Sequence, residues 1–140
     1  MISIGCDHGG YEIKEAIVAY LKENSIPFID FGTNSSESVD YPVFAKKVCD
    51  SIIKGESSLG ILCCGTGIGM SIVANKQRGI RAAVLSDEFS AKSTRAHNNA
   101  NVLCLGGRII DNEKAIKLAE IFINTPFEGG RHINRVEMFE

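Results

Sequence analysis

Three short segments of this 140-residue chain place reactive side chains beside glycines. They are Asp7-His8-Gly9-Gly10, Cys64-Gly65-Thr66-Gly67-Ile68-Gly69 and Gly106-Gly107-Arg108. Carboxylate, imidazole and thiol groups can move protons or attack an electrophile, and a guanidinium can hold an anion. A glycine-rich turn that opens a helix points free N–H groups at a phosphate or a developing oxyanion. These segments therefore favour acid–base or nucleophilic chemistry on an anionic substrate.

The second segment admits more than one interpretation. Cys64 ends an apolar run, and a thiol there faces the positive end of the next helix, which favours a thiolate base or nucleophile. A buried structural thiol and a tight strand–helix turn explain the same residues. The loop is not a dinucleotide fingerprint, because Met70 stands three residues after Gly67, and it lacks the Gly-Lys-Ser/Thr of a P-loop. Cys63 should point to the opposite face of its strand and pack there.

The carboxylate and imidazole side chains outside this segment also have purely structural explanations. Asp7 could orient a substrate hydroxyl or cap a helix, and the two roles are compatible. His8 could bind an anion or shuttle a proton, whereas His97 and His132 fit ordinary surface positions equally well.

The tail carries two arginines at helical spacing. Arg131 and Arg135 stand four residues apart, so one helical face could present both to a phosphate. A solvated helix face near a chain end explains the pair equally well. Glycines at 129 and 130 indicate a specific bend just before them.

The elements that must position these residues alternate between apolar runs and amphipathic stretches. Apolar runs predict strands over 2–6, 27–31, 59–64, 80–85 and 102–105. Helical spacing predicts helices over 11–24, 41–52, about 68–76, 87–99 and 112–124, of which 87–99 is polar enough to face a cleft or a partner subunit. We therefore predict one domain, residues 1–140, built as a three-layer, doubly wound, five-stranded parallel sheet of Rossmann-like type. The loops after its strands should meet at one edge, where ligands bind.

Composition excludes some classes of protein. The net charge of −2, from 15 basic and 17 acidic residues, argues against a general binder of nucleic acid or of membrane surfaces. No apolar run approaches the ~20 residues of a membrane span, and the first ten residues do not look like a signal peptide. The five cysteines have no metal-type spacing and suggest free thiols in a reducing compartment. We expect a cytoplasmic protein.

Taken together, these residues match a known family over nearly the full length of the chain. The chain resembles the type B ribose-5-phosphate isomerases, relatives of the galactose-6-phosphate and allose-6-phosphate isomerases. The matching segments are 5–10, Asp40-Tyr41-Pro42, 64–69, Ala74-Asn75-Lys76, Gly79-Ile80-Arg81-Ala82, His97-Asn98, Asn101-Val102-Leu103, Gly129-Gly130-Arg131-His132 and Arg135-Val136-Glu137.

The resemblance implies that the protein interconverts ribose 5-phosphate and ribulose 5-phosphate through a cis-enediolate, a step of the pentose phosphate pathway. It implies a homodimer with sites shared between subunits, or a tetramer, with no metal and no organic cofactor. By position, Cys64 resembles the base that moves the proton between C2 and C1. His97 resembles the acid that opens the sugar ring, assisted by Asp7. Thr66 counts among the catalytic residues.

The same resemblance assigns the binding residues. The backbone of the glycine loop, 65–69, resembles the anion hole for the enediolate. Asn98 and Tyr41 resemble contacts to sugar hydroxyls. The phosphate ligands implied are His8, Arg108, Arg131 and Arg135.

Three alternatives remain open. The substrate could be a six-carbon phosphosugar, because one more carbon is only modestly discriminated. A cysteine phosphatase would need an arginine after the five residues that follow Cys64, and Met70 stands there. A nucleotide-sensing module would use the glycine loop as a phosphate cradle without turning over a sugar.

Overall fold

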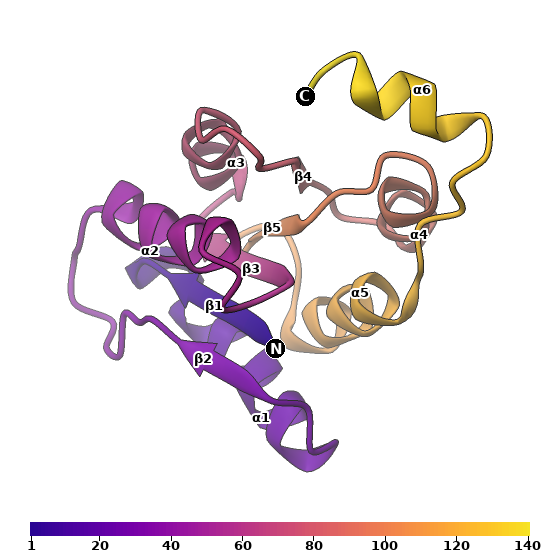
Figure 1. Ribbon diagram of the computed structural model, residues 1–140. Helices are drawn as coiled ribbons and strands as arrows, with labels where there is room; N and C mark the ends of the chain where they lie inside the picture. The colour runs from indigo at the N-terminus through magenta and orange to yellow at the C-terminus, as the bar shows by residue number, and fades with distance from the viewer.

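The computed structural model describes residues 1–140 and is built around a parallel sheet (Figure 1). Its five strands lie in the order β2-β1-β3-β5-β4, and every neighbouring pair is parallel. The strands are β1 (Ile2–Cys6), β2 (Phe28–Asp30), β3 (Leu59–Cys64), β4 (Ala82–Val84) and β5 (Val102–Gly106). The helices are the 3₁₀ turn η1 (His8–Gly10), then α1 (Tyr11–Glu23), α2 (Tyr41–Ile53), α3 (Ile68–Asn75), α4 (Glu88–Ala96), α5 (Asn112–Asn124) and α6 (His132–Glu137).

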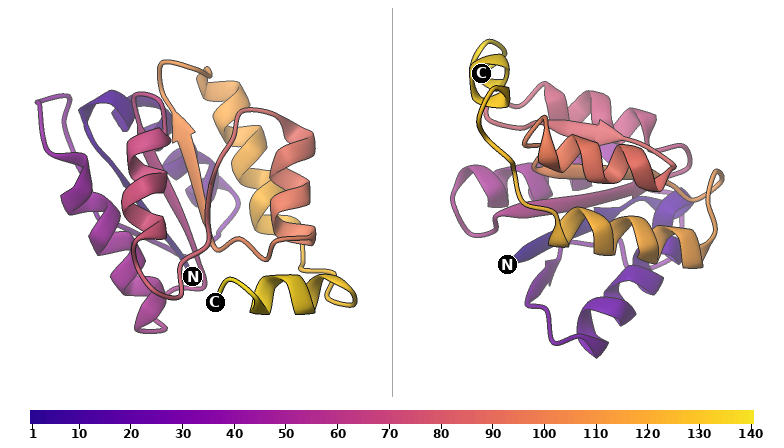
Figure 2. Two further views of the ribbon diagram at one scale, coloured as in Figure 1. Left: turned by 90° about the horizontal axis from the view of Figure 1, so that it is seen from above. Right: turned by 90° about the vertical axis from the view of Figure 1, so that its right-hand side faces the viewer.

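Helices cover both faces of the sheet, so the predicted three-layer, doubly wound architecture is confirmed (Figures 1 and 2). One core joins β1, β3 and β5 to α1 and α5, and its largest helical side chain is Phe122. The other core joins the opposite face of β3 and β5 to α2 and α3. The central strand β3 is buried on both sides, which explains why its sequence is apolar without alternation.

Neighbouring cysteines on β3 illustrate the two layers. Cys63 belongs to the α1–α5 core and Cys64 to the α2–α3 core, because successive strand residues face opposite sides. The prediction that Cys63 packs on the far face is confirmed.

The chain order creates a switch point beside these cysteines. From β1 the chain moves outward to β2, then returns to β3 on the other side of β1 and continues toward β5 and β4. At such a point the loops after the two central strands splay apart and leave a crevice at the carboxyl edge. Asp7 follows β1 and its N–H donates to the Cys63 carbonyl at 3.1 Å, so the two loops begin side by side.

The strand and helix boundaries differ from the predictions in one place that matters. The helix predicted over 87–99 ends at Ala96, and His97 is its C-cap. Asn99 has a φ of +50°, which turns the chain out of the helix. Two arginines hold that turn: Arg95 donates to Asn99 Oδ1 and Arg81 to the Asn99 carbonyl. Strand β4 is also shorter than predicted, at 82–84.

The C-terminal segment crosses to the other end of the sheet. Gly129 and Gly130 have φ of +71° and +56°, so the predicted bend is confirmed. Figure 2 shows α6 lying beyond the amino ends of the strands. No helix combines the length and apolar character that crossing a bilayer requires.

Candidate active site

A cavity of ≈410 Å³ opens at the carboxyl edge, between the loops after β1, β3 and β5. Each of the three segments that carry reactive side chains contributes to it, so their predicted convergence is correct. Its lining residues are Asp7, His8, Gly9, Tyr41, Cys64, Gly65, Thr66, Ile68, Gly69, Ile72 and Arg108. Ile72 was not predicted, although it stands four residues after Ile68 on the same face of α3.

A larger hollow of ≈870 Å³ lies next to this cavity, between α1 and the start of α5. It shares His8 and Gly9 with the smaller one, but its walls carry the carboxylates of Glu12, Glu15, Asp111 and Glu113. Such walls repel an anionic substrate, whereas the smaller cavity contains Arg108 and the glycine loop. The smaller cavity is therefore the candidate site.

The Cys64 thiol lies at the amino end of α3. Its Sγ accepts a hydrogen bond from the Gly67 N–H at 3.1 Å, and Gly67 is the N-cap of the helix. A thiolate accepts such a bond better than a thiol does. Gly67 has a φ of +80°, and a Cβ there would lie 2.9 Å from the Leu105 carbonyl carbon, so this turn requires glycine.

The other four cysteines do not line the cavity. Burial raises the pKa of Cys6 and of Cys49 to about 12. It also raises the pKa of Cys63 and Cys104 well above the usual value for a thiol. Neutral, buried thiols of this kind serve packing. Cys64 is also buried, at 4% exposed, but it lines the cavity and is therefore the thiol placed for chemistry.

Backbone hydrogen bonds fasten the glycine loop to the turn after β5. The Gly107 N–H donates to the Cys64 carbonyl at 2.8 Å, and the Arg108 N–H donates to the Gly65 carbonyl at 2.9 Å. The Arg108 side chain lies alongside Gly65, where a Cβ would sit 3.5 Å from its Nε. Within the loop, Thr66 Oγ1 accepts from the Ile68 N–H at 3.2 Å. The guanidinium and the loop are thus held together against one wall of the cavity.

The Asp7 and His8 side chains are oriented by the turn that follows β1. Asp7 Oδ1 accepts from the N–H groups of Gly9 and Gly10 at 2.9 and 3.2 Å, so the predicted capping role is confirmed for η1. The same side chain lines the cavity, so capping leaves a substrate contact open. His8 Nδ1 accepts from the Val39 N–H at 3.2 Å, which makes Nε2 the donating nitrogen of the neutral ring.

Four predicted site residues are not near this cavity within one chain. His97 and Asn98 follow α4 and lie at the amino ends of the strands. Their location there is marked by the next residues of the chain, because the Asn101 carbonyl accepts a hydrogen bond from the N–H of Gly60, near the start of β3. The length of β5 separates the two edges by about 13 Å, given about 3.3 Å of rise per residue. The exposed residues Arg131 and Arg135 belong to the start and body of α6 at this same end.

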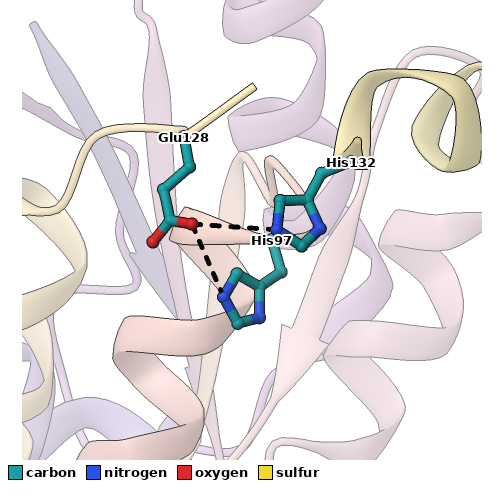
Figure 3. Close-up of side chains that lie close together, drawn as sticks. All are labelled: His97, Glu128 and His132. Carbon is teal, nitrogen blue, oxygen red and sulfur yellow. Dashed lines mark ion pairs between the residues drawn. The ribbon is translucent and has the colours of Figure 1, made fainter. Parts of the chain in front are cut away.

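His97 instead lies in a cluster with Glu128 and His132, shown in Figure 3. The two imidazole rings stack with centroids 4.4 Å apart. His132 is 8% exposed, so its interpretation as a surface residue is wrong; the bend at Gly129 and Gly130 turns it inward. The contribution of Glu128 was not predicted, because its sequence neighbourhood gives no sign that it meets His97.

Comparison with known proteins agrees with this geometry. The family model described as Ribose/Galactose Isomerase matches residues 2–139. The ribose-5-phosphate isomerase B of Escherichia coli is 48% identical over 97% of this chain and 91% of its own length. The ribose-5-P isomerase B of Listeria innocua is 42% identical over 99% and 94%.

Solved structures give the same result. The ribose 5-phosphate isomerase of Thermotoga maritima superposes with a TM-score of 0.96 at 50% identity, covering 99% of this chain and 95% of that one. The enzyme of Mycoplasma genitalium, solved with bound ribulose-5-phosphate, gives 0.93 at 41% identity, covering 98% and 91%. The protein belongs to the ribose/galactose isomerase family.

Proposed function

We propose that this protein interconverts ribose 5-phosphate and ribulose 5-phosphate. The observation that carries the proposal is the Cys64 thiol at the amino end of α3, in one cavity with Asp7, His8 and Arg108. Relatives that share this fold at 40–50% identity are ribose-5-phosphate isomerases, and one is described with bound ribulose-5-phosphate.

The proton-transfer step uses Cys64 as the base. The Cys64 thiolate removes the proton from C2 of the open-chain aldose, and the electron pair moves through C1 onto O1. Backbone N–H groups of the glycine loop, including Thr66, stabilise the enediolate oxygen that results. The O2 proton then passes to O1, and Cys64 returns its proton to C1, which leaves a ketone at C2. A single base on one face requires a cis-enediolate.

Binding of the phosphate would hold the sugar in register with this base. His8 and Arg108 supply donors at the carboxyl edge of the same chain. Tyr41 borders the cavity on α2 and offers its hydroxyl to the sugar, while Asp7 assists ring opening. Fixing both ends of a short substrate lowers the entropy cost of reaching the transition state.

The remaining site residues are assigned to a second copy of the chain in a homodimer. Within one chain His97, Asn98, Arg131 and Arg135 lie about the length of a strand away from Cys64. The outer surface of α3, β4 and α4 carries apolar side chains that a partner would cover: Ile72, Val84 and Phe89 are 56%, 41% and 80% exposed. His97 of the partner subunit would then open the sugar ring. Two such dimers could form a tetramer.

Two further assignments go with this function. We assign the whole chain, 1–140, to one sugar-phosphate isomerase domain, because both cores pack on the same sheet. We assign the protein to the cytoplasm, where a reducing environment would keep its five cysteines as free thiols.

The experiment is incubation of the purified protein with ribose 5-phosphate in D₂O, followed by NMR. Formation of ribulose 5-phosphate with deuterium at C1 would support both the reaction and the proton-transfer route. Turnover of allose 6-phosphate or galactose 6-phosphate in its place would keep the chemistry and change the substrate. No turnover of any of the three sugars would overturn the proposal.

A further inference from the structure

The His97–Glu128–His132 cluster has three potential metal ligands from segments that are tied together (Figure 3). The Glu128 N–H donates to the carbonyl of Ala96, the last residue of α4, at 3.0 Å, which holds the tail against the segment that carries His97. The His132 N–H donates to the Gly129 carbonyl at 3.1 Å and closes the bend. The three side chains therefore meet because of backbone hydrogen bonds.

The distances within the cluster fit a metal ion. Nε2 of His97 and Nε2 of His132 lie 3.8 and 3.7 Å from Glu128 Oε1, too far for direct hydrogen bonds. All three ligand atoms lie within 4.8 Å of one another, so a point equidistant from them is at most about 2.4 Å from each. Zinc–ligand bonds of about 2.0–2.2 Å need only a small contraction of this triangle.

The side chains have the freedom to make that contraction. The rings are stacked at an interplanar angle of 15°, so χ2 of at least one imidazole must rotate to aim its lone pair at the ion. That torsion is broad for histidine, and the His97 side chain is 44% exposed. Glu128 is 58% exposed and can follow.

The donor set selects the class of metal. Two imidazoles and one carboxylate suit Zn²⁺ and Co²⁺, with a fourth position left for water. Arg131, the N-cap of α6, and Arg135 belong to the same segment as His132, so they place positive charge nearby and oppose weakly held cations. Hard ions such as Mg²⁺ are disfavoured because they prefer oxygen ligands, whereas two of the three donors here are imidazole nitrogens.

We propose that His97, Glu128 and His132 form a site for a divalent transition metal of the Zn²⁺ class, and that its occupation inhibits the enzyme. The binding half of this proposal depends on the cluster alone. The inhibitory half rests on the proposed function, in which His97 opens the sugar ring. A metal bound to His97 Nε2 removes that nitrogen's lone pair from proton exchange and holds the imidazole in the cluster, so the metal and the ring-opening step exclude each other.

The test of binding uses Co²⁺ as a spectroscopic probe and Zn²⁺ in calorimetry, on the metal-free, full-length protein. We expect visible d–d bands of tetrahedral Co²⁺. Glu128→Gln should weaken binding of both ions by about tenfold or more, because it removes an anionic ligand. His132→Asn should do the same. The matched control is Glu137→Gln, which changes an exposed carboxylate on α6 and should bind normally.

A second control separates this site from the thiol of the candidate active site. Cys64→Ser should keep Co²⁺ binding, and the wild-type spectrum should show no sulfur-to-cobalt charge-transfer band. Loss of binding in Cys64→Ser, unchanged binding in Glu128→Gln, or no binding to the wild type would each overturn the site.

The isomerase assay then tests inhibition independently. Zn²⁺ should inhibit turnover by the wild type. Each variant is compared with its own rate in the absence of metal. On this scale, Zn²⁺ should inhibit Glu128→Gln less than it inhibits the wild type. Binding without inhibition would refute the inhibitory half only. Absence of turnover in the metal-free wild type would instead refute the proposed function and leave the metal site standing on its spectrum.

Discussion

The α carbon of Gly69 faces the ring of Tyr41 so closely that a Cβ there would lie 2.8 Å from Cζ and 2.9 Å from Cε2. The third glycine of the glycine loop thus determines where a hydroxyl on α2 stands in the cavity. The contact joins α3, which begins within the glycine loop, to the first turn of α2.

We predict that Gly69→Ala lowers kcat/KM by about tenfold or more, because displacing Tyr41 disturbs the position of the substrate. Ordinarily a glycine-to-alanine change inside a helix raises stability by about 1 kcal/mol. Here the clash should cancel that gain. Steady-state kinetics and chemical denaturation check the two effects. An active, more stable variant would contradict the contact, and Tyr41→Phe separates the role of the hydroxyl from that of the ring.

Cys64→Ala should lower kcat by about 10²–10⁴-fold, the usual contribution of a general base, and leave the fold intact. Cys63→Ala is the matched control: the adjacent thiol faces the other core, so the change should reduce stability and leave kcat unchanged. Steady-state kinetics and thermal unfolding of both variants provide the measurement. Comparable loss of kcat in the two variants would mean that Cys64 acts through packing.

Alkylation should distinguish the same thiols. At pH 8, iodoacetamide should modify Cys64 rapidly, because this thiol lines the open cavity although it is only 4% exposed. The other four cysteines should react slowly, because they do not line the cavity and burial raises the pKa of Cys6 and Cys49 to about 12. Mass spectrometry of the native protein should show one fast adduct, which a saturating sugar phosphate protects. Denatured protein should take up five. A fast adduct at any other cysteine would be incompatible with this assignment.

Stability should fall at alkaline pH for a related reason. The folded protein holds the Cys49 thiol neutral with a pKa of about 12, against 9.0 for an ordinary thiol. A thiol whose pKa is higher in the folded than in the unfolded protein makes its full contribution to stability at any pH below the pKa of the unfolded state. That contribution is lost as pH rises toward the pKa of the folded state. The unfolding free energy should therefore decline between about pH 9 and pH 12. Urea titrations should show a shallower decline for Cys49→Ala; an identical slope would rule Cys49 out as a cause.

Sequence reasoning predicted the fold and the carboxyl-edge site well because both depend on local signals. The unbroken apolar run over 59–64 indicates a strand buried on both faces, and Gly67 marks the turn that requires a positive φ. The end of α4 was placed three residues too late, because the turn at Asn99 is held by Arg81, which reaches it from outside the helix, together with Arg95 of the last helical turn. Glu128 was missed for the same kind of reason: its proximity to His97 depends on long-range folding of the tail.

The separation of Cys64 from His97 leads to a complementation test of the shared site. In the proposed dimer each site takes Cys64 from one subunit and His97 from the other. Cys64→Ala and His97→Asn homodimers should both be poorly active. After subunit exchange, half of the dimers are mixed, and each mixed dimer has one site with both native residues. We therefore expect recovery of about a quarter of wild-type activity. Sites formed within one chain could not recover, so a mixture no more active than the average of its parents would exclude sharing.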